Sequence, residues 1–402
     1  MYRLLRSVAA ASAVAGAAAL LTTSAALASV SPLSEFEQAR SRASTLQSGG
    51  DIRAKAALGA AADYLAVATA ESLWVDENDA VPPPEGDAVF TNSTAALQEL
   101  GRILTDHSVS SEAVLGVSGE IREAQTDLAD IALEEVQGST SAPGSAISKW
   151  KTAFSTLSKQ ISKATTSVPQ STVELAASDY LSSDEHELSA IPQPITGPAL
   201  TLEGKPELFY FGAEGCPFCG VQRWSMAVAL AQFGTFSPLA VQVSSTTDLD
   251  RATHTLSFYK AKYKSPYVAF VPVEAATNQP CRSETCEFPW TPLQAPTAGE
   301  QEILARYEVE GIPFLDVADS WATSGSYANP AVVSGMSWQQ IAATLSEPAS
   351  VAGQAIDGGA EILAAQICEV DGEQPARVCD SGVLRHYQEE AKSGFRSSFP
   401  PP

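Results

Sequence analysis

The sequence predicts a chain in two parts, an all-α helical bundle followed by an α/β domain. Residues 33–180 contain no cysteine, and their apolar residues recur three or four positions apart, the spacing of one helix face. After Leu200, short apolar runs alternate with helical segments, which is typical of a layered α/β structure. The 402 residues, 45% of them hydrophobic, are enough for two or three domains with apolar cores.

The N-terminal part should form a bundle of about four helices over residues 33–180. Glycine and proline interrupt the helical pattern at residues 49–50, 81–84 and 138–144. The segments between these breaks are rich in Ala, Leu, Glu, Lys and Gln, which favour helices. The expected helices include Asp51–Trp74, Ser93–Thr105, Ser111–Glu135 and Ser145–Ala164.

The C-terminal part is expected over residues 200–392, after a polar and proline-bearing linker at 181–199. Residues 393–402 should be a frayed tail. The apolar runs predict strands at Leu208–Phe211, Leu239–Val243, Tyr267–Val273 and Phe314–Val317. Helical spacing predicts helices at Val221–Phe233 and Gly299–Tyr307.

The first 28 residues have the pattern of a secretory signal peptide. Arg3 and Arg6 precede an uncharged apolar segment, and Ala26-Leu27-Ala28 fits the small residues of a cleavage site. Cleavage after Ala28 would give a secreted or extracytoplasmic protein of the cell envelope. Retention of the segment as a membrane anchor is the alternative. No later segment is apolar for long enough to span a bilayer.

The charge balance argues against a nucleic-acid partner. The chain has 47 acidic and 24 basic residues, whereas phosphate binding requires a basic face.

The motif Cys216-Pro217-Phe218-Cys219 is the main candidate for chemistry. It follows a predicted strand and opens a predicted helix, so the first sulfur should lie near helix N-terminal amides that stabilise a thiolate. Cys216 is then the expected nucleophile of thiol–disulfide exchange, and Cys219, one turn into the helix, resolves the mixed disulfide. Pro217 suits the first helical turn because it has no amide hydrogen to lose.

A second feature is the segment Gly311-Ile312-Pro313-Phe314, between a predicted helix and a predicted strand. Proteins of the thioredoxin superfamily place a cis-proline opposite the dithiol, and the residue before it offers its backbone to the substrate. We therefore predict a cis Ile312–Pro313 bond with both residues in the substrate-binding loop.

The other four cysteines favour structural disulfides, Cys281 with Cys286 and Cys368 with Cys379, because an exported chain meets an oxidising compartment. Other pairings stay open. Zinc held by Cys216, Cys219 and the pair at 281 and 286 is an alternative, with loose spacing. We expect no bound metal and no cofactor.

Several phrases together resemble the domain-of-unknown-function 929 (DUF929) family of thioredoxin-like proteins. Their residues are Gly204-Lys205-Pro206, the stretch from Phe211 to Cys219, Arg223-Trp224, Ser265-Pro266-Tyr267, Gly311 to Phe314, Gly335 to Trp338 and the Cys368/Cys379 pair. The resemblance covers about residues 170–385. It implies a thioredoxin-like fold with a dithiol site at Cys216 and Cys219, and it implies no particular substrate.

The sequence departs from thioredoxin at Tyr210 and in the length of the segment after Cys219. Tyr210 stands six residues before Cys216, where thioredoxin has a buried acid. Glu214 supports the motif by position, but we expect it to be exposed. The segment between Cys219 and Pro313 is long and predicts an insertion around residues 245–300, tethered by the disulfide at 281 and 286.

The expected function is that of an exported thiol–disulfide oxidoreductase acting on protein thiols or disulfides together with an unidentified redox partner. The alternative is a non-catalytic binding or structural protein of the cell envelope built on a thioredoxin-like scaffold. Among the four histidines only His254 is expected near the site, while Trp224 and Trp338 are expected in the core.

Overall fold

A computed structural model describes residues 32–47, 49–78, 83–104, 108–136, 155, 158–182, 189–245, 248, 250, 253–281, 286–309, 311–336 and 338–393. The predicted signal peptide, the break at 138–144 and the tail at 394–402 lie outside these residues. Among the described helices, none is both long and apolar enough to cross a membrane.

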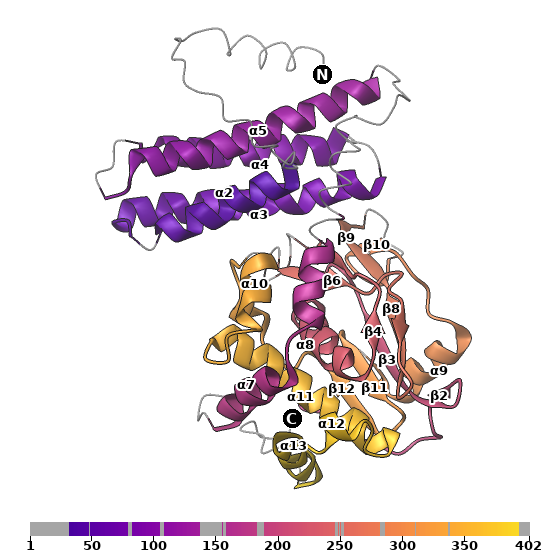
Figure 1. Ribbon diagram of the computed structural model, residues 1–402. Helices are drawn as coiled ribbons and strands as arrows, with labels where there is room; N and C mark the ends of the chain where they lie inside the picture. Colours follow the sequence, from indigo (N-terminus) through magenta and orange to yellow (C-terminus); the bar gives the residue numbers. More distant parts are fainter. Residues whose placement is uncertain are drawn as a thin grey trace. The chain divides into compact units, whose positions relative to one another are not determined.

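The N-terminal part is helical, as predicted (Figure 1). Its helices are α2 (Pro32–Gln47), α3 (Ile52–Asn78), α4 (Pro83–Gly101) and α5 (Ser111–Val136). Helix α3 packs against both α2 and α4, and α5 packs against α2. Alanines fill much of the buried surface, together with larger side chains such as Phe36, Leu58 and Leu100. Small side chains let helix backbones approach closely, which suits this alanine-rich sequence.

Helix α4 begins earlier than the sequence predicts. We expect a break through residues 81–84 and a helix from Ser93, but the helix begins at Pro83. Proline is tolerated in the first turn of a helix, because the amide hydrogen that it lacks has no intrahelical acceptor there. The proline run therefore lies between α3 and α4, as predicted, and also forms the first turn of α4. Of the expected helix at 145–164, the structure describes residue 155 and the stretch from 158 onward, which is helical to residue 166.

The C-terminal part contains a mixed β-sheet. Its strands, in order across the sheet, are β1 (Gln193–Pro194), β12 (Trp321–Ser324), β11 (Phe314–Val317), β3 (Lys205–Gly212) and β8 (Ala269–Glu274). β3 and β8 are parallel, whereas β11 is antiparallel to both β3 and β12. The short β2 (Thr201–Leu202) folds back on the start of β3. Helix α8 (Pro217–Phe233) follows β3 directly, which brings its N-terminus to the end of that strand.

The two faces of β3 enter different cores. Leu208 and Tyr210 belong to a core that contains residues of α8 and α11 (Val351–Asp371). Phe209 and Phe211 point to the other face and pack with Ile303 of α9 (Ala298–Arg306). This alternation is the period of two that places successive side chains on opposite faces of a strand. A strand covered by helices on both faces is consistent with the uninterrupted apolar run at residues 208–211.

Three further pairs of strands are separate from this sheet. They are β4 (Thr235–Phe236) with β7 (Tyr263–Lys264), β5 (Ala240–Val243) with β6 (His254–Ser257), and β9 (Ala276–Pro280) with β10 (Trp290–Pro292). The last pair follows β8 and lies within the expected insertion range. A disulfide between Cys281 and Cys286 closes the connection between its strands.

Helices complete the C-terminal part. Besides α11 they are the 3₁₀ helix η1 (Pro330–Val333), α10 (Trp338–Thr344), α12 (Ala376–Cys379) and α13 (Gly382–Ser393). Helix α7 (Gln170–Ser182) also packs against α11. Two segments that precede the expected range of 200–392, α7 and β1, therefore pack with the α/β part.

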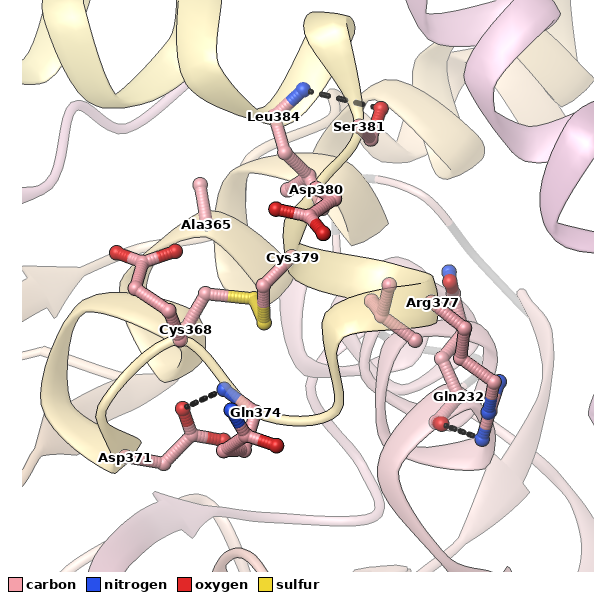
Figure 2. Close-up of a disulfide and its surroundings, with 12 residues drawn as sticks. Gln232, Ala365, Cys368, Asp371, Gln374, Arg377, Cys379, Asp380, Ser381 and Leu384 are labelled. Carbon is pink, nitrogen blue, oxygen red and sulfur yellow. Dashed lines mark hydrogen bonds between the residues drawn. A yellow bond between two sulfur atoms is a disulfide. The ribbon is translucent and has the colours of Figure 1, made fainter.

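The Cys368–Cys379 disulfide joins the last turns of α11 to the short α12 (Figure 2). Near it, Asp371 Oδ1 accepts a hydrogen bond from Gln374 N at 3.0 Å, and Arg377 Nη2 donates to Gln232 O of α8 at 2.7 Å. The disulfide thus fixes the turn after α11, and Arg377 attaches that turn to the helix that carries the dithiol.

Candidate functional site: the dithiol at the start of α8

The Cys216 sulfur caps the N-terminus of α8. Cys216 has an extended backbone, and its Sγ accepts a hydrogen bond from Cys219 N at 3.2 Å. Pro217 occupies the first turn, as predicted from its missing amide hydrogen. The partial positive charge of the helix terminus and the donated amide both favour the thiolate form of Cys216.

The two cysteines are free thiols with opposite properties. Cys216 is 5% exposed and Cys219 is fully buried. Burial raises the pKa of Cys216, but hydrogen bonds from Cys219 and the Arg223 charge outweigh it, so that the net pKa is lowered. Burial, reinforced by the neighbouring Cys216, raises the pKa of Cys219 well above its ordinary value. Cys216 is thus the better nucleophile, while Cys219 keeps its proton until something removes it.

The Ile312–Pro313 peptide bond is cis, as the sequence predicts. The Cys216 thiol donates to Ile312 O at a Sγ–O distance of 3.8 Å. Pro313 is buried, Ile312 is half-buried and Gly311 is exposed. The exposed residue of this loop is therefore Gly311, whereas Ile312 packs against the dithiol cluster.

A fully buried ion pair stands beside the dithiol. Arg223 lies on α8, one turn after Cys219, and its Nε donates to Glu274 Oε1 at 2.9 Å. Its Nη2 also donates to Ala213 O at 2.7 Å, in the segment that leads from β3 to Cys216. Glu274 ends β8, opposite Gly212 of β3. The guanidinium is the positive charge that lowers the pKa of Cys216 after the hydrogen bonds from Cys219.

Tyr210 lies on β3, six residues before Cys216. Its side chain is fully buried, and its hydroxyl has no hydrogen-bond partner among the described residues. A Cβ added to Gly212 would collide with Tyr210 Oη and would lie 3.1 Å from Cys219 Sγ. The hydroxyl and the buried sulfur are therefore neighbours across Gly212. Burial, as the main cause, raises the pKa of Tyr210 well above its ordinary value, so the phenol stays protonated.

Aromatic side chains from the β9–β10 segment cover the dithiol. Trp290 packs in one cluster with Cys216 and Cys219, and Phe218, Phe288 and Ile312 pack against that cluster. Trp290 and Phe288 stack with their planes 17° apart. A Cβ at Gly215 would lie 2.5 Å from the Trp290 ring, so only glycine leaves room for the indole there. The wall beside Cys216 is apolar.

The expectation that Glu214 is exposed is wrong. Its side chain is only 3% exposed, and it accepts hydrogen bonds from Ser257 Oγ at 2.5 Å and from Gln242 Nε2 at 3.0 Å. These donors come from β6 and β5, whose hairpin lies beside the segment that leads to Cys216. Glu214 therefore anchors the dithiol loop to that hairpin.

The remaining cysteines form the two local pairs that the sequence favours, Cys281 with Cys286 and Cys368 with Cys379. Sulfur atoms in these bonds are not thiolate ligands, which leaves the four-cysteine zinc alternative without two of its ligands. Within the described part of the chain, one group of three potential metal ligands gathers, at Cys368, Glu373 and Cys379. Two of its members form a disulfide, so the group does not fit a metal.

His254 makes its polar contacts away from the dithiol. It is buried, with its Nε2 2.6 Å from Glu37 Oε2 and its Nδ1 2.7 Å from Arg40 Nη1. Trp224 and Trp338 are fully buried core residues, as predicted. Their indole nitrogens donate to backbone carbonyls of β6, among them His254 O.

No role for Arg223, Glu274 or Trp290 follows from the sequence alone. Arg223 is unusual in the sequence because it is the one charged residue of the helix expected at 221–233. Glu274 directly follows an apolar strand. Neither signal identifies the partner, because the two residues are 51 positions apart.

Comparison with known families supports the resemblance found in the sequence. Residues 193–369 match the family described as "Domain of unknown function (DUF929)". The match includes β1, the dithiol and most of α11. No curated protein and no solved structure matches the chain.

Proposed function

We propose that this chain, whose residues 193–369 match a family of unknown function, is an exported thiol–disulfide oxidoreductase that uses Cys216 and Cys219. One observation carries the proposal. Cys216 Sγ accepts the Cys219 amide at the start of α8 and lies 3.8 Å from the carbonyl oxygen that precedes a cis-proline. This arrangement combines an activated sulfur with a backbone group beside which an extended substrate segment can bind.

The chemistry follows from the different character of the two thiols. In reduction, the Cys216 thiolate attacks a substrate disulfide, and one substrate sulfur leaves as a thiolate. Cys219 then loses its proton and attacks Cys216, which forms the Cys216–Cys219 disulfide and releases the second substrate sulfur. In oxidation the same steps run backwards, and the substrate dithiol leaves as a disulfide. Two electrons are exchanged in either direction, and no metal or organic cofactor is required.

The strand order also supports a thioredoxin-like fold for the proposed enzyme. Parallel β3 and β8 are linked through α8, and antiparallel β11 and β12 extend the same sheet. The dithiol at the first α8 turn and the cis-proline before β11 occupy the positions that such a fold gives to its redox site. In this proposal the β9–β10 segment is an addition that supplies the aromatic wall.

An extracytoplasmic location is part of the proposal. It rests on the signal-peptide pattern of residues 1–28 and on the pairing of four cysteines into disulfides. Disulfides of this kind persist in oxidising compartments and are rare in the cytosol.

Trapping of a mixed disulfide tests the function. The Cys219→Ser variant keeps the nucleophile and removes the resolving thiol, so it should accumulate a covalent complex with a substrate protein that a reductant releases. Cys216→Ser is the matched control and should trap nothing. If Cys219→Ser forms no mixed disulfide with insulin or with a reduced and reoxidised test protein, the proposal fails.

The low exposure of Cys216 is the observation that favours the second candidate, a non-catalytic scaffold. A redox titration against glutathione separates the two functions. A redox enzyme should equilibrate with the glutathione pool, whereas a structural Cys216–Cys219 disulfide would resist reduction at potentials below about −300 mV.

A further inference from the structure

The hydroxyl of Tyr210 is a buried hydrogen-bond donor with no acceptor among the described residues. A buried polar group without a partner loses the free energy of its hydration, and most native structures avoid this. The ring itself is well packed, with an edge-to-face contact to Phe258 at a centroid distance of 5.4 Å. Packing alone would be satisfied by phenylalanine at this position, so the hydroxyl calls for an explanation.

Its surroundings supply one. The Tyr210 hydroxyl and Cys219 Sγ both border the space beside Gly212, where a Cβ would collide with the hydroxyl and would lie 3.1 Å from the sulfur. Arg223, Glu274 and Cys216 are the other charged or titratable groups that act on the phenol. Arg223 and Glu274 are held by each other, which leaves the two cysteines as the groups whose charge changes during exchange. Of these, Cys219 is the one whose sulfur borders the space beside Gly212.

We propose that Tyr210 donates a hydrogen bond to the Cys219 thiolate that forms when a substrate thiolate opens the Cys216–Cys219 disulfide. This inference rests on the proposed function and assigns a further catalytic residue to it. It also specifies the substrate class that the site favours, which is protein dithiols that become oxidised.

The step balances as follows. A substrate thiolate attacks Cys216 Sγ, forming a substrate–Cys216 disulfide and breaking the Cys216–Cys219 bond. The bonding electrons leave with Cys219 as a thiolate in a fully buried position. Tyr210 Oη makes no hydrogen bond to Cys219 Sγ in the dithiol form. In this step its hydroxyl moves toward the charged sulfur, donates a hydrogen bond to it and keeps its own proton. The second substrate thiolate attacks the substrate sulfur of the mixed disulfide, so the substrate leaves as a disulfide and Cys216 as a thiolate.

The chemical difference between a phenol and a carboxylate indicates which direction of thiol–disulfide exchange the site favours. A carboxylate near Cys219 can accept its proton, which promotes attack by Cys219 on a mixed disulfide. A neutral phenol donates a hydrogen bond but is a poor proton acceptor. It therefore stabilises Cys219 as a leaving group more than it activates Cys219 as a nucleophile. Reaction of the disulfide form with thiols is the step that gains most.

The test is the Tyr210→Phe variant of the full chain, with Tyr263→Phe as control. Tyr263 is also a largely buried tyrosine, but its hydroxyl donates to Leu230 O. The rate constant for opening of the Cys216–Cys219 disulfide by dithiothreitol should fall about tenfold or more in Tyr210→Phe, because a hydrogen bond to a charged group is lost. It should stay within about twofold of the wild type in Tyr263→Phe. Thermal unfolding should show no loss of stability in Tyr210→Phe, because the deleted hydroxyl has no partner to lose.

A second measurement does not depend on exchange. In a Cys216→Ser background, a carbon-NMR titration of the Cys219 Cβ should show a higher thiol pKa in Tyr210→Phe than with Tyr210 present. An unchanged rate or an unchanged Cys219 pKa overturns the role of Tyr210. A wild-type chain that exchanges with no thiol contradicts the proposed function, and the titration still decides whether Tyr210 interacts with the Cys219 thiolate.

Discussion

Arg223 Nε lies 2.9 Å from Glu274 Oε1, and both side chains are fully buried beside the dithiol. The pair joins α8, which carries the dithiol in its first turn, to the end of β8. Its guanidinium also holds Ala213 O, three residues before Cys216. Buried pairs of this kind contribute little net stability when intact, but removing one partner leaves an uncompensated charge. Arg223 therefore both holds the dithiol loop in place and supplies a positive charge that lowers the pKa of Cys216.

The two halves of this pair should have opposite effects on Cys216. Arg223→Gln removes the positive charge that favours the thiolate, so the pKa of Cys216 should rise. Glu274→Gln removes the opposing negative charge and should lower it further. Thiolate absorbance against pH measures both shifts. Shifts of the same sign in the two variants would contradict an electrostatic role.

Stability should fall in both variants for the same reason. Each leaves one buried ionic group without its partner, and such a loss typically costs about 3–5 kcal/mol. Urea unfolding measures it, and Arg385→Gln is the control, because Arg385 pairs with Asp380 at an exposed position. That exposed pair should contribute no more than about 1 kcal/mol.

The contact between Gly215 and Trp290 predicts that the aromatic wall depends on a glycine. A methyl group at residue 215 would lie 2.5 Å from the indole, so Gly215→Ala must displace the ring or the dithiol loop. We expect a loss of about 1–3 kcal/mol from overpacking and a shifted tryptophan emission spectrum.

The matched control for that prediction is Gly299→Ala in the first turn of α9, where an added Cβ meets nothing within 4 Å. This variant should leave the emission spectrum unchanged and keep or slightly raise stability, because alanine favours helices. Equal stability of Gly215→Ala and Gly299→Ala would show that the wall adjusts without cost.

Local patterns account for what the sequence predicted correctly. The apolar run at 208–211 and the cysteine motif after it predicted a strand and a helix start, and both occur at Lys205–Gly212 and Pro217–Phe233. The cis bond before Pro313 and the helical N-terminal part were also predicted. Each depends on residues close together in the chain.

The errors at the candidate site arise where partners are distant. The prediction for Glu214 failed because Ser257 and Gln242, which bind it, are 43 and 28 positions away. No pattern in the residues around Glu214 indicates that its carboxylate is bound by the β5–β6 hairpin. The same holds for Arg223 and Glu274, and for Trp290 beside Gly215. The sequence shows that these residues are unusual at their positions. Their partners become clear only when separate helices and strands pack together.

The disulfide between Cys368 and Cys379 should be important for stability. Its cysteines are 11 positions apart, so it closes a short loop between α11 and α12. Restricting the unfolded chain by such a loop should stabilise the folded state by about 3 kcal/mol. The Cys368→Ala/Cys379→Ala variant should lower the free energy of unfolding by about that amount. Urea unfolding in the absence of reductant measures the change.

The control for the disulfide is Cys281→Ala/Cys286→Ala, whose cysteines are 5 positions apart and close a smaller loop. Its loss of stability should be the smaller of the two, because loop entropy grows with loop length. Removal of this disulfide should increase the mobility of the β9–β10 segment, which carries Trp290. If removing the pair at 368 and 379 left stability unchanged, that disulfide would have no constraining role.

Two buried carboxyls on α11 should make stability depend on pH. Asp357 and Glu361 have no exposed surface, and their oxygens lack hydrogen-bond partners among the described residues. Burial raises the pKa of each to about 8, with a smaller contribution to Glu361 from the neighbouring Glu174 and Asp357. Both groups are therefore protonated in the folded chain at neutral pH.

The sign follows from comparison with the unfolded chain, where these carboxyls ionise near pH 4. Between about pH 4 and about pH 8 the folded state holds protons that the unfolded state has released, so stability falls as pH rises. Below this range both states are protonated, and above it both are ionised. The window spans about 4 pH units, so the loss of stability over it is on the order of 5 kcal/mol per carboxyl.

Asp357→Asn should therefore remove part of this slope. The variant should differ little from the wild type at about pH 5 and be more stable at about pH 8, because the amide needs no proton to stay neutral. Urea midpoints across this range measure the effect. Glu369→Gln, an exposed position on the same helix, is the control and should leave the slope unchanged. If the stabilities of the wild type and Asp357→Asn changed in parallel between pH 5 and pH 8, Asp357 would be ionised in the folded chain, contrary to the prediction.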